Sequence, residues 1–169
     1  LGARLQHRLA THIPVAPFNA TSDRPAVSFS FDDVPVSAVT LGAQMMEDAG
    51  ARATYYVAGG LLGVRDRHWQ VMDASQVLDM HGRGHEIACH SHSHIRADRM
   101  TGAGIVADIE RNHALLRALE PSLPLENFAY PYGQASLAWK FRLKNRFRSS
   151  RSIWPRLNHG PTDAHYLHS

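Results

Sequence analysis

The chain has 169 residues, of which 44% are hydrophobic and 20% charged, and a formal net charge of +3. This length supports one sizeable core, and the single cysteine excludes an internal disulfide. No stretch reaches the roughly 18 apolar residues of a membrane helix, and no basic segment is interleaved with aromatic residues, so we expect neither a membrane span nor nucleic-acid binding.

Residues 1–24 contain Pro14, Pro17 and several polar residues, and they are predicted to form an N-terminal arm or leader. Because the sequence starts at Leu1, a signal peptide could have been removed before it. A cytoplasmic and an exported location are therefore both compatible with the sequence.

The first strand signal covers residues 26–31 and ends in an Asp-Asp pair. Bulky and small residues alternate along it, which would turn the bulky ones toward covering helices and the small ones toward a barrel interior. Asp32 then lies at the carboxyl end on the inward face, and Asp33 begins the next loop. One aspartate here could simply cap a helix, but the pair favours one metal ligand and one free base.

Further strand signals follow at 53–58, 86–89, 127–130 and 148–153. Helical patterns lie between them, from Val36 to Met46, after Asp73, and from Ile105 to Leu119. Alternating strands and helices predict an α/β fold with a parallel sheet or barrel, in which catalytic residues lie at the carboxyl ends of the strands.

His90 and His94 are four residues apart, directly after a predicted strand. Two such histidines and a carboxylate from elsewhere are usual ligands of a catalytic zinc-type ion with open positions for water. We expect Ser91 to brace the loop through a side-chain hydrogen bond, and His92 to point away from the ion. Cys89 suits a buried thiol better than a metal ligand.

A third group of residues, Pro131-Tyr132-Gly133, follows the apolar strand at 127–130. Proline fixes one backbone dihedral and glycine permits an unusual turn. Such a turn can aim a backbone N–H at a developing oxyanion, although by itself it is also an ordinary turn.

Together these three groups resemble the motifs of the NodB-homology polysaccharide deacetylases, carbohydrate esterase family 4. The family's first motif ends in Asp-Asp, its second is His-Ser/Thr-x-x-His, and its third ends in Pro-Tyr/Phe-Gly. The matching segments are Phe31-Asp32-Asp33, His90 to His94 with the lead-in 84–87, and Pro131-Tyr132-Gly133. The resemblance covers roughly residues 25 to 160.

The resemblance implies a distorted (β/α) barrel of the NodB type over residues 25–169, with 1–24 as the arm. Five predicted strands are too few to close such a barrel, so we expect the last strands to be missing. An open sheet edge could then support self-association.

The resemblance also implies the roles of individual residues. Asp33, His90 and His94 would bind a divalent metal ion. Zn2+ is the preferred candidate, and Co2+ or another divalent ion is the alternative. Asp32 would be the general base, and the backbone N–H of Tyr132 would contact the tetrahedral intermediate.

Two features depart from the family pattern. Ala129 stands where many members carry an arginine that orients the catalytic aspartate, so another cation must orient Asp32 or the base is less constrained. The family's last motif, an apolar strand ending in Leu-x-His that supplies a general acid, is not evident. His165 and His168 lie in a segment without that apolar run.

Seven basic residues and no acidic one lie between Asn127 and Thr162. We expect this run to be a solvated face, and a contact surface for an anionic glycan or a phosphate-bearing carrier is the alternative.

The sequence therefore predicts a metal-dependent hydrolase that removes N-acetyl groups from a sugar polymer or oligosaccharide, with an acetylated glycan as its partner. Two alternatives stay open. One is a hydrolase of another C–N or ester bond, such as an allantoinase-like enzyme or an O-acetyl esterase. The other is a weakly active, glycan-binding remnant.

Overall fold

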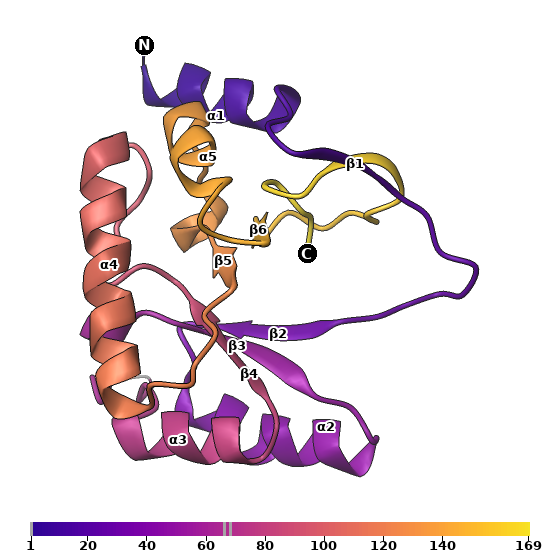
Figure 1. Cartoon of the computed structure of the whole chain (residues 1–169). Coiled ribbons are helices and arrows are strands. Elements are labelled where there is room, and N and C mark those ends of the chain that lie inside the picture. Colours follow the sequence, from indigo (N-terminus) through magenta and orange to yellow (C-terminus); the bar gives the residue numbers. More distant parts are fainter. Residues whose placement is uncertain (1, 66, 68) are drawn as a thin grey trace.

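The computed structural model describes residues 2–65, 67 and 69–169, and its centre is a curled parallel sheet (Figure 1). Within these residues five strands pair in chain order: β2 (Phe29–Asp32), β3 (Ala53–Val57), β4 (Glu86–Cys89), β5 (Asn127–Ala129) and β6 (Ser149–Arg151). They form a half-barrel of the distorted NodB type, as predicted. All five carboxyl ends therefore lie at the same edge of the sheet.

The helices cover the outer side of the sheet, with α2 and α3 below it, α4 on the left, and α5 and α1 above it in the view of Figure 1. Their bounds are α1 (Ala3–His12), α2 (Ala43–Asp48), α3 (Ala74–Gly82), α4 (Gly102–Leu119) and α5 (Leu137–Leu143). Shorter turns are η1 (Ala38–Gly42), η2 (Gly59–Leu61) and η3 (Pro131–Gly133). In the described part of the chain, no helix combines the length and the apolar character that crossing a membrane requires.

The helix boundaries follow the sequence signals. Asp73 is the N-cap of α3: its side chain accepts from Gln76 N (3.0 Å), and the Gln76 side chain accepts from Asp73 N in return. Gly50, with φ +69°, follows the end of α2 in the left-handed conformation typical of the residue after a helix C-cap. The long helix α4 ends at Leu119, just before Pro121.

The two faces of the sheet differ in the size of their side chains. On the outer face, Tyr55, Ile87 and Phe128 are buried in the cores formed with the helices. On the inner face, Ala88 and Ala129 form a separate small cluster with Tyr56. On these three strands the bulky side chains thus lie mostly outside and the small ones inside, which leaves room at the inner edge for polar side chains.

The first strand of the sheet begins later than predicted. Pairing starts with Phe29 opposite Ala53, and two of the bulky residues predicted to face covering helices are exposed, Val27 at 79% and Phe29 at 44%. Since β3 itself begins at Ala53, residues before Phe29 have no partner strand. Phe31 does face the helices, and its ring stacks on that of Tyr55 with 5.2 Å between centroids.

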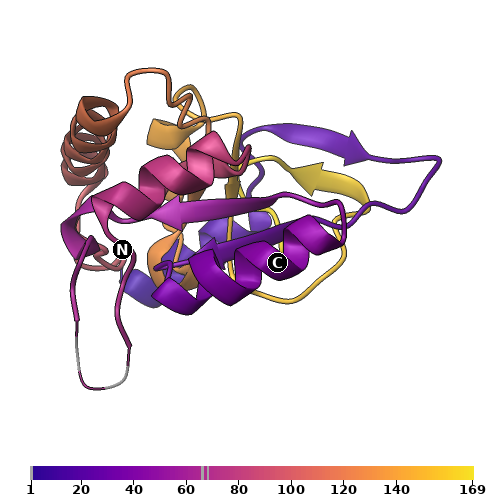
Figure 2. The same cartoon turned by 90° about the horizontal axis from the view of Figure 1, so that it is seen from below.

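The N-terminal segment is tied to the C-terminal one. An antiparallel ribbon, seen on the right of Figure 2, joins β1 (Pro17–Ala20) to β7 (Gly160–Asp163). The ammonium group of Lys140 donates to the carbonyl oxygens of Ala10 and Ile13 and lies 2.6 Å from the Asp163 carboxylate. The division of the chain at residue 24 stays a prediction.

Residues 164–167 run along the outer edge of β6. Ser150 N donates to Ala164 O (2.8 Å), and Ser152 N donates to Leu167 O (2.8 Å). This edge of the sheet is therefore covered, and self-association stays a prediction.

The prediction that the basic run forms a solvent-exposed face is wrong at two positions. Lys140 is 1% exposed and Arg151 is 9% exposed. Each pairs with an aspartate from a distant segment, Lys140 with Asp163 and Arg151 with Asp32. Burial without such partners would be costly for either cation, so the pairs explain why both side chains turn inward.

Candidate metal centre

Three donor side chains converge at the carboxyl edge of the sheet. Asp33 follows β2, and His90 and His94 lie in the loop after β4. One donor atom from each of the three lies within 4.8 Å of the others. Asp33 Oδ1 is 2.9 Å from His94 Nε2 and 3.6 Å from His90 Nε2. The structure thus brings together the three residues that the sequence predicts as metal ligands.

The backbone around these donors is unusual. Asp33 (φ +56°), Ser91 (φ +63°) and His94 (φ +49°) all adopt the left-handed conformation that non-glycine residues rarely occupy. Such conformations cost roughly 1–3 kcal/mol each and cluster at functional sites. The hydroxyl of Ser91 accepts from His94 N (3.1 Å), which confirms the predicted bracing of this loop.

The ring of His90 is held in one orientation. Its Nδ1 lies 2.8 Å from the carbonyl oxygen of Ala129, and because a carbonyl only accepts, Nδ1 carries the proton. The lone pair of Nε2 then points toward Asp33. Burial lowers the pKa of His90 and so favours the neutral ring that a metal ion requires.

These donors fit a divalent cation. Asp33 Oδ1 is buried, and the ring nitrogens of His94 and His90 lie 2.9 and 3.6 Å from it. A neutral imidazole that binds a metal ion through Nε2 donates no hydrogen bond from that atom, so the ion itself would satisfy the buried carboxylate oxygen. Two imidazole nitrogens and one carboxylate oxygen also form the three-ligand set of open catalytic zinc sites.

The second carboxylate, Asp32, lies beside this cluster but is not one of its donors. It ends β2, and its carboxylate accepts a hydrogen bond from the guanidinium of Arg151, which ends β6. The guanidinium also lies over the ring of Tyr56, 4.5 Å from its centroid. A cation from another strand therefore orients Asp32 in place of the arginine missing at Ala129. Arg151 lies inside the predicted strand 148–153, and nothing in the sequence marks it as the partner of Asp32.

Replacing Arg151 by methionine should lower turnover by about 10–100-fold, as loss of an outer-shell partner typically does. Metal content should not change, because Arg151 contacts none of the three donors. The control is Arg148→Met, which removes an exposed pair with Glu126 near the same strand and should have no effect. Equal turnover in the two variants would contradict the role of Arg151.

Tyr132 lies in the turn η3 next to the cluster. Its φ is +58°, and its ring packs on that of His94 with 4.6 Å between centroids. Gly133 has φ +63°, and a side chain there would meet Ile153 at 2.4 Å. The turn therefore needs glycine at this position, and it places the ring of Tyr132 against that of His94.

The neighbouring candidates lie outside the cluster. His92 packs against Gly60, away from the three donors, as expected. Cys89 is a buried free thiol that accepts a hydrogen bond from Asn112 Nδ2 (3.3 Å), and burial raises the pKa of its thiol to about 12. The prediction of a structural thiol is therefore confirmed.

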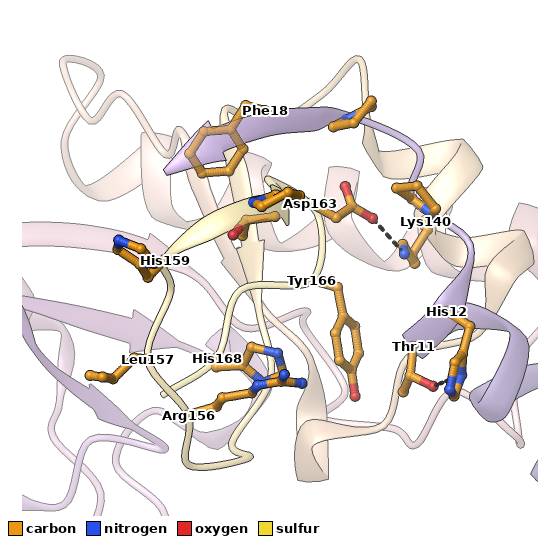
Figure 3. Close-up of a pocket in the computed structure, with 14 residues that line it drawn as sticks. Thr11, His12, Phe18, Lys140, Arg156, Leu157, His159, Asp163, Tyr166 and His168 are labelled. Atoms are coloured by element: carbon orange, nitrogen blue, oxygen red, sulfur yellow. Dashed lines mark hydrogen bonds and ion pairs between the residues drawn. The ribbon is translucent and has the colours of Figure 1, made fainter. Parts of the chain in front are cut away.

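The two histidines near the C-terminus also have their contacts elsewhere. His165 Nδ1 lies 2.9 Å from Ser150 Oγ. Figure 3 shows His168 beside Tyr166 and Arg156, in a pocket of about 320 Å³ whose lining residues include none of the three donors. The structure thus places neither histidine with Asp33, His90 and His94.

Solved structures of similar fold were found in several bacteria. IcaB from Ammonifex degensii has a TM-score of 0.74 at 19% identity, over 86% of this chain and 67% of IcaB. The Streptococcus pyogenes deacetylase PplD has a TM-score of 0.71 at 15% identity, over 99% and 71% of the two chains. A family 4 carbohydrate esterase from Streptomyces lividans has a TM-score of 0.61 at 20% identity, and the match covers 79% of this chain and 65% of the esterase.

These identities are low, so the likeness to solved structures concerns the fold. A comparison with curated proteins finds no significant match. The sequence profile of the polysaccharide deacetylases, however, matches residues 19–145, which is more than half of the chain. The chain therefore belongs to the polysaccharide deacetylase family.

Proposed function

We propose that the chain is a metal-dependent hydrolase that removes N-acetyl groups from a sugar polymer or oligosaccharide. Membership of the polysaccharide deacetylase family supports carbohydrate deacetylation. The observation that carries the proposal is that a set of metal-binding donors and a separate carboxylate lie side by side at one edge of the sheet. A three-donor cluster lies next to Asp32, a carboxylate that Arg151 orients and that takes no part in the cluster.

Asp33, His90 and His94 would hold the metal ion, and the nitrogen and oxygen donors favour zinc, with cobalt as the alternative. A bound divalent ion supplies polarisation of the substrate carbonyl and a lower pKa for bound water. The hydrogen bond from His90 Nδ1 to Ala129 O fixes the tautomer and the orientation of that ring, and burial lowers its pKa and so favours the neutral form.

The chain's own residues would carry the protons and bind the developing charge. Asp32 accepts the proton of the attacking water as general base. The backbone N–H of Tyr132 donates to the carbonyl oxygen as it gains negative charge. The water oxygen bonds to the carbonyl carbon, the C–N bond breaks as the nitrogen takes the proton that Asp32 had accepted, and the products are acetate and a free amine on the sugar.

The neighbours are consistent with this product. PplD and the Streptomyces lividans esterase were both solved in complex with acetate. An O-acetyl esterase would release acetate as well, however, and a weakly active remnant would still bind the glycan. Substrate preference therefore separates the three functions.

The test is acetate release, in the presence of zinc or cobalt, from chitin-type, peptidoglycan-type and acetylxylan oligomers and from a simple acetyl ester. We expect N-acetylated oligomers to be the better substrates. Release from the esters alone would indicate an esterase, and binding of oligomers without release would indicate a remnant. The Asp32→Asn variant controls for contaminating hydrolases.

A further inference from the structure

A buried carboxylate from α4 supports the loop that carries His90 and His94. Asp108, which is 9% exposed, accepts hydrogen bonds at Oδ2 from the backbone N–H groups of His92 (2.8 Å) and Ser93 (3.0 Å). Its other oxygen, Oδ1, accepts from the hydroxyl of Ser93 (2.6 Å). The carboxylate thus binds His92 and Ser93, two consecutive residues that lie between the two histidines of the metal site.

The loop needs such support because its backbone is strained. Ser91 and His94, on either side of the residues that Asp108 binds, have positive φ angles. Strained conformations persist only where the surrounding structure determines them from several directions. Asp108 supplies this support with three hydrogen bonds from a single side chain.

The next turn of α4 supports the neighbouring loop in the same way. Asn112, fully buried, accepts from Gly59 N (2.7 Å) and donates to Val57 O (3.0 Å). Gly60 N in turn donates to His92 O (2.9 Å). Two polar residues one turn apart on α4 therefore hold the loops after β3 and β4 together.

We propose that Asp108 is a positioning residue that sets the distance between His90 and His94 for metal binding. The inference rests on the proposed metal-dependent function and adds a residue to it that contacts neither the ion nor the substrate. Without the carboxylate, Ser91 and His94 can relax to ordinary backbone angles, and the His94 ring leaves the cluster.

Three variants separate geometry from charge. Asp108→Ala removes all three hydrogen bonds. Asp108→Asn keeps an oxygen for the two backbone N–H groups and places an amide opposite the Ser93 hydroxyl, which can accept from it. Ile109→Val changes the adjacent residue of α4, which is fully buried in the core on the α5 side, and serves as the control for a general effect on the helix.

The measurement is zinc affinity by competition with a chelator, together with the visible absorption spectrum of the cobalt-loaded protein, which reports ligand geometry. We expect Asp108→Ala to bind zinc about 10–100-fold more weakly, with a changed spectrum. Asp108→Asn and Ile109→Val should stay close to wild type. Wild-type affinity and spectrum in a folded Asp108→Ala variant would overturn the inference.

If Asp108→Ala does not fold, Ser93→Ala decides the question, because it removes one contact of the carboxylate at an exposed residue. We expect zinc affinity to fall about two- to tenfold, the range for one hydrogen bond, and unchanged affinity would overturn the inference. A wild-type protein that binds no zinc would instead contradict the metal site itself, and the inference with it. Zinc binding without acetate release would contradict only the proposed reaction.

Discussion

Asp32→Asn should retain bound zinc and lose about 10²–10⁴-fold of turnover, the contribution of a general base. The amide has nearly the same shape, and its oxygen can still accept the hydrogen bond from Arg151, but it cannot take a proton from water. Metal content should not change, because Asp32 is not one of the three converging donors. Elemental analysis and acetate release, measured on the same preparation, check both parts.

The neighbouring residue provides the matched comparison. Asp33→Asn is an equally small change one position along, and it should weaken metal binding because it replaces a charged ligand by a neutral one. The two roles would be reversed if Asp32→Asn lost the metal while Asp33→Asn kept it.

His94→Ala should weaken zinc binding by at least about 100-fold, beyond the 10–100-fold that outer-shell partners contribute, and should abolish turnover. His90→Ala should act in the same way. The control is His92→Ala, which removes the third histidine of the same run, one that packs against Gly60 instead of joining the cluster. Equal metal content in the variants of His90, His92 and His94 would contradict the assignment.

The affinity for zinc should also depend on pH. Both imidazoles bind as neutral rings, so protons compete with the metal and the affinity falls as the pH decreases. Burial lowers the pKa of His90, so this ring stays neutral below its usual value of about 6.5. When zinc affinity is measured from pH 8 down to about 5, we therefore expect the decline caused by protonation of His90 to begin below about pH 6.5. An affinity that increased toward low pH would contradict the ligand set.

The sequence could predict the metal cluster because its parts are local. Asp33 and His90 each follow an apolar strand, and parallel strands end at one edge of the sheet. His94 lies in the same loop as His90, so the fold class alone brings all three close together. Helix ends could be predicted for a similar reason, since the capping box of Asp73 and Gln76 is complete within four residues.

The supporting residues could not be predicted, because their partners are distant in sequence. Arg151 and Asp32 are 119 positions apart, and only the curl of the sheet brings β6 opposite β2. Asp108 lies in α4 at a position that in sequence resembles any polar helix residue. Lys140 belongs to a basic run that composition alone assigns to the surface, and its burial depends on Asp163 and on the end of α1.

The most direct test of the account is a zinc titration of the metal-free protein, with acetate release from an N-acetylglucosamine oligomer as the readout. After treatment with a chelator, the protein should release no acetate, and activity should then rise in proportion to added zinc until one equivalent is bound. The same titration of His94→Ala should stay flat. Full activity in the metal-free protein, or a rise in the His94→Ala variant equal to that of the wild type, would contradict a reaction that depends on a metal held by Asp33, His90 and His94.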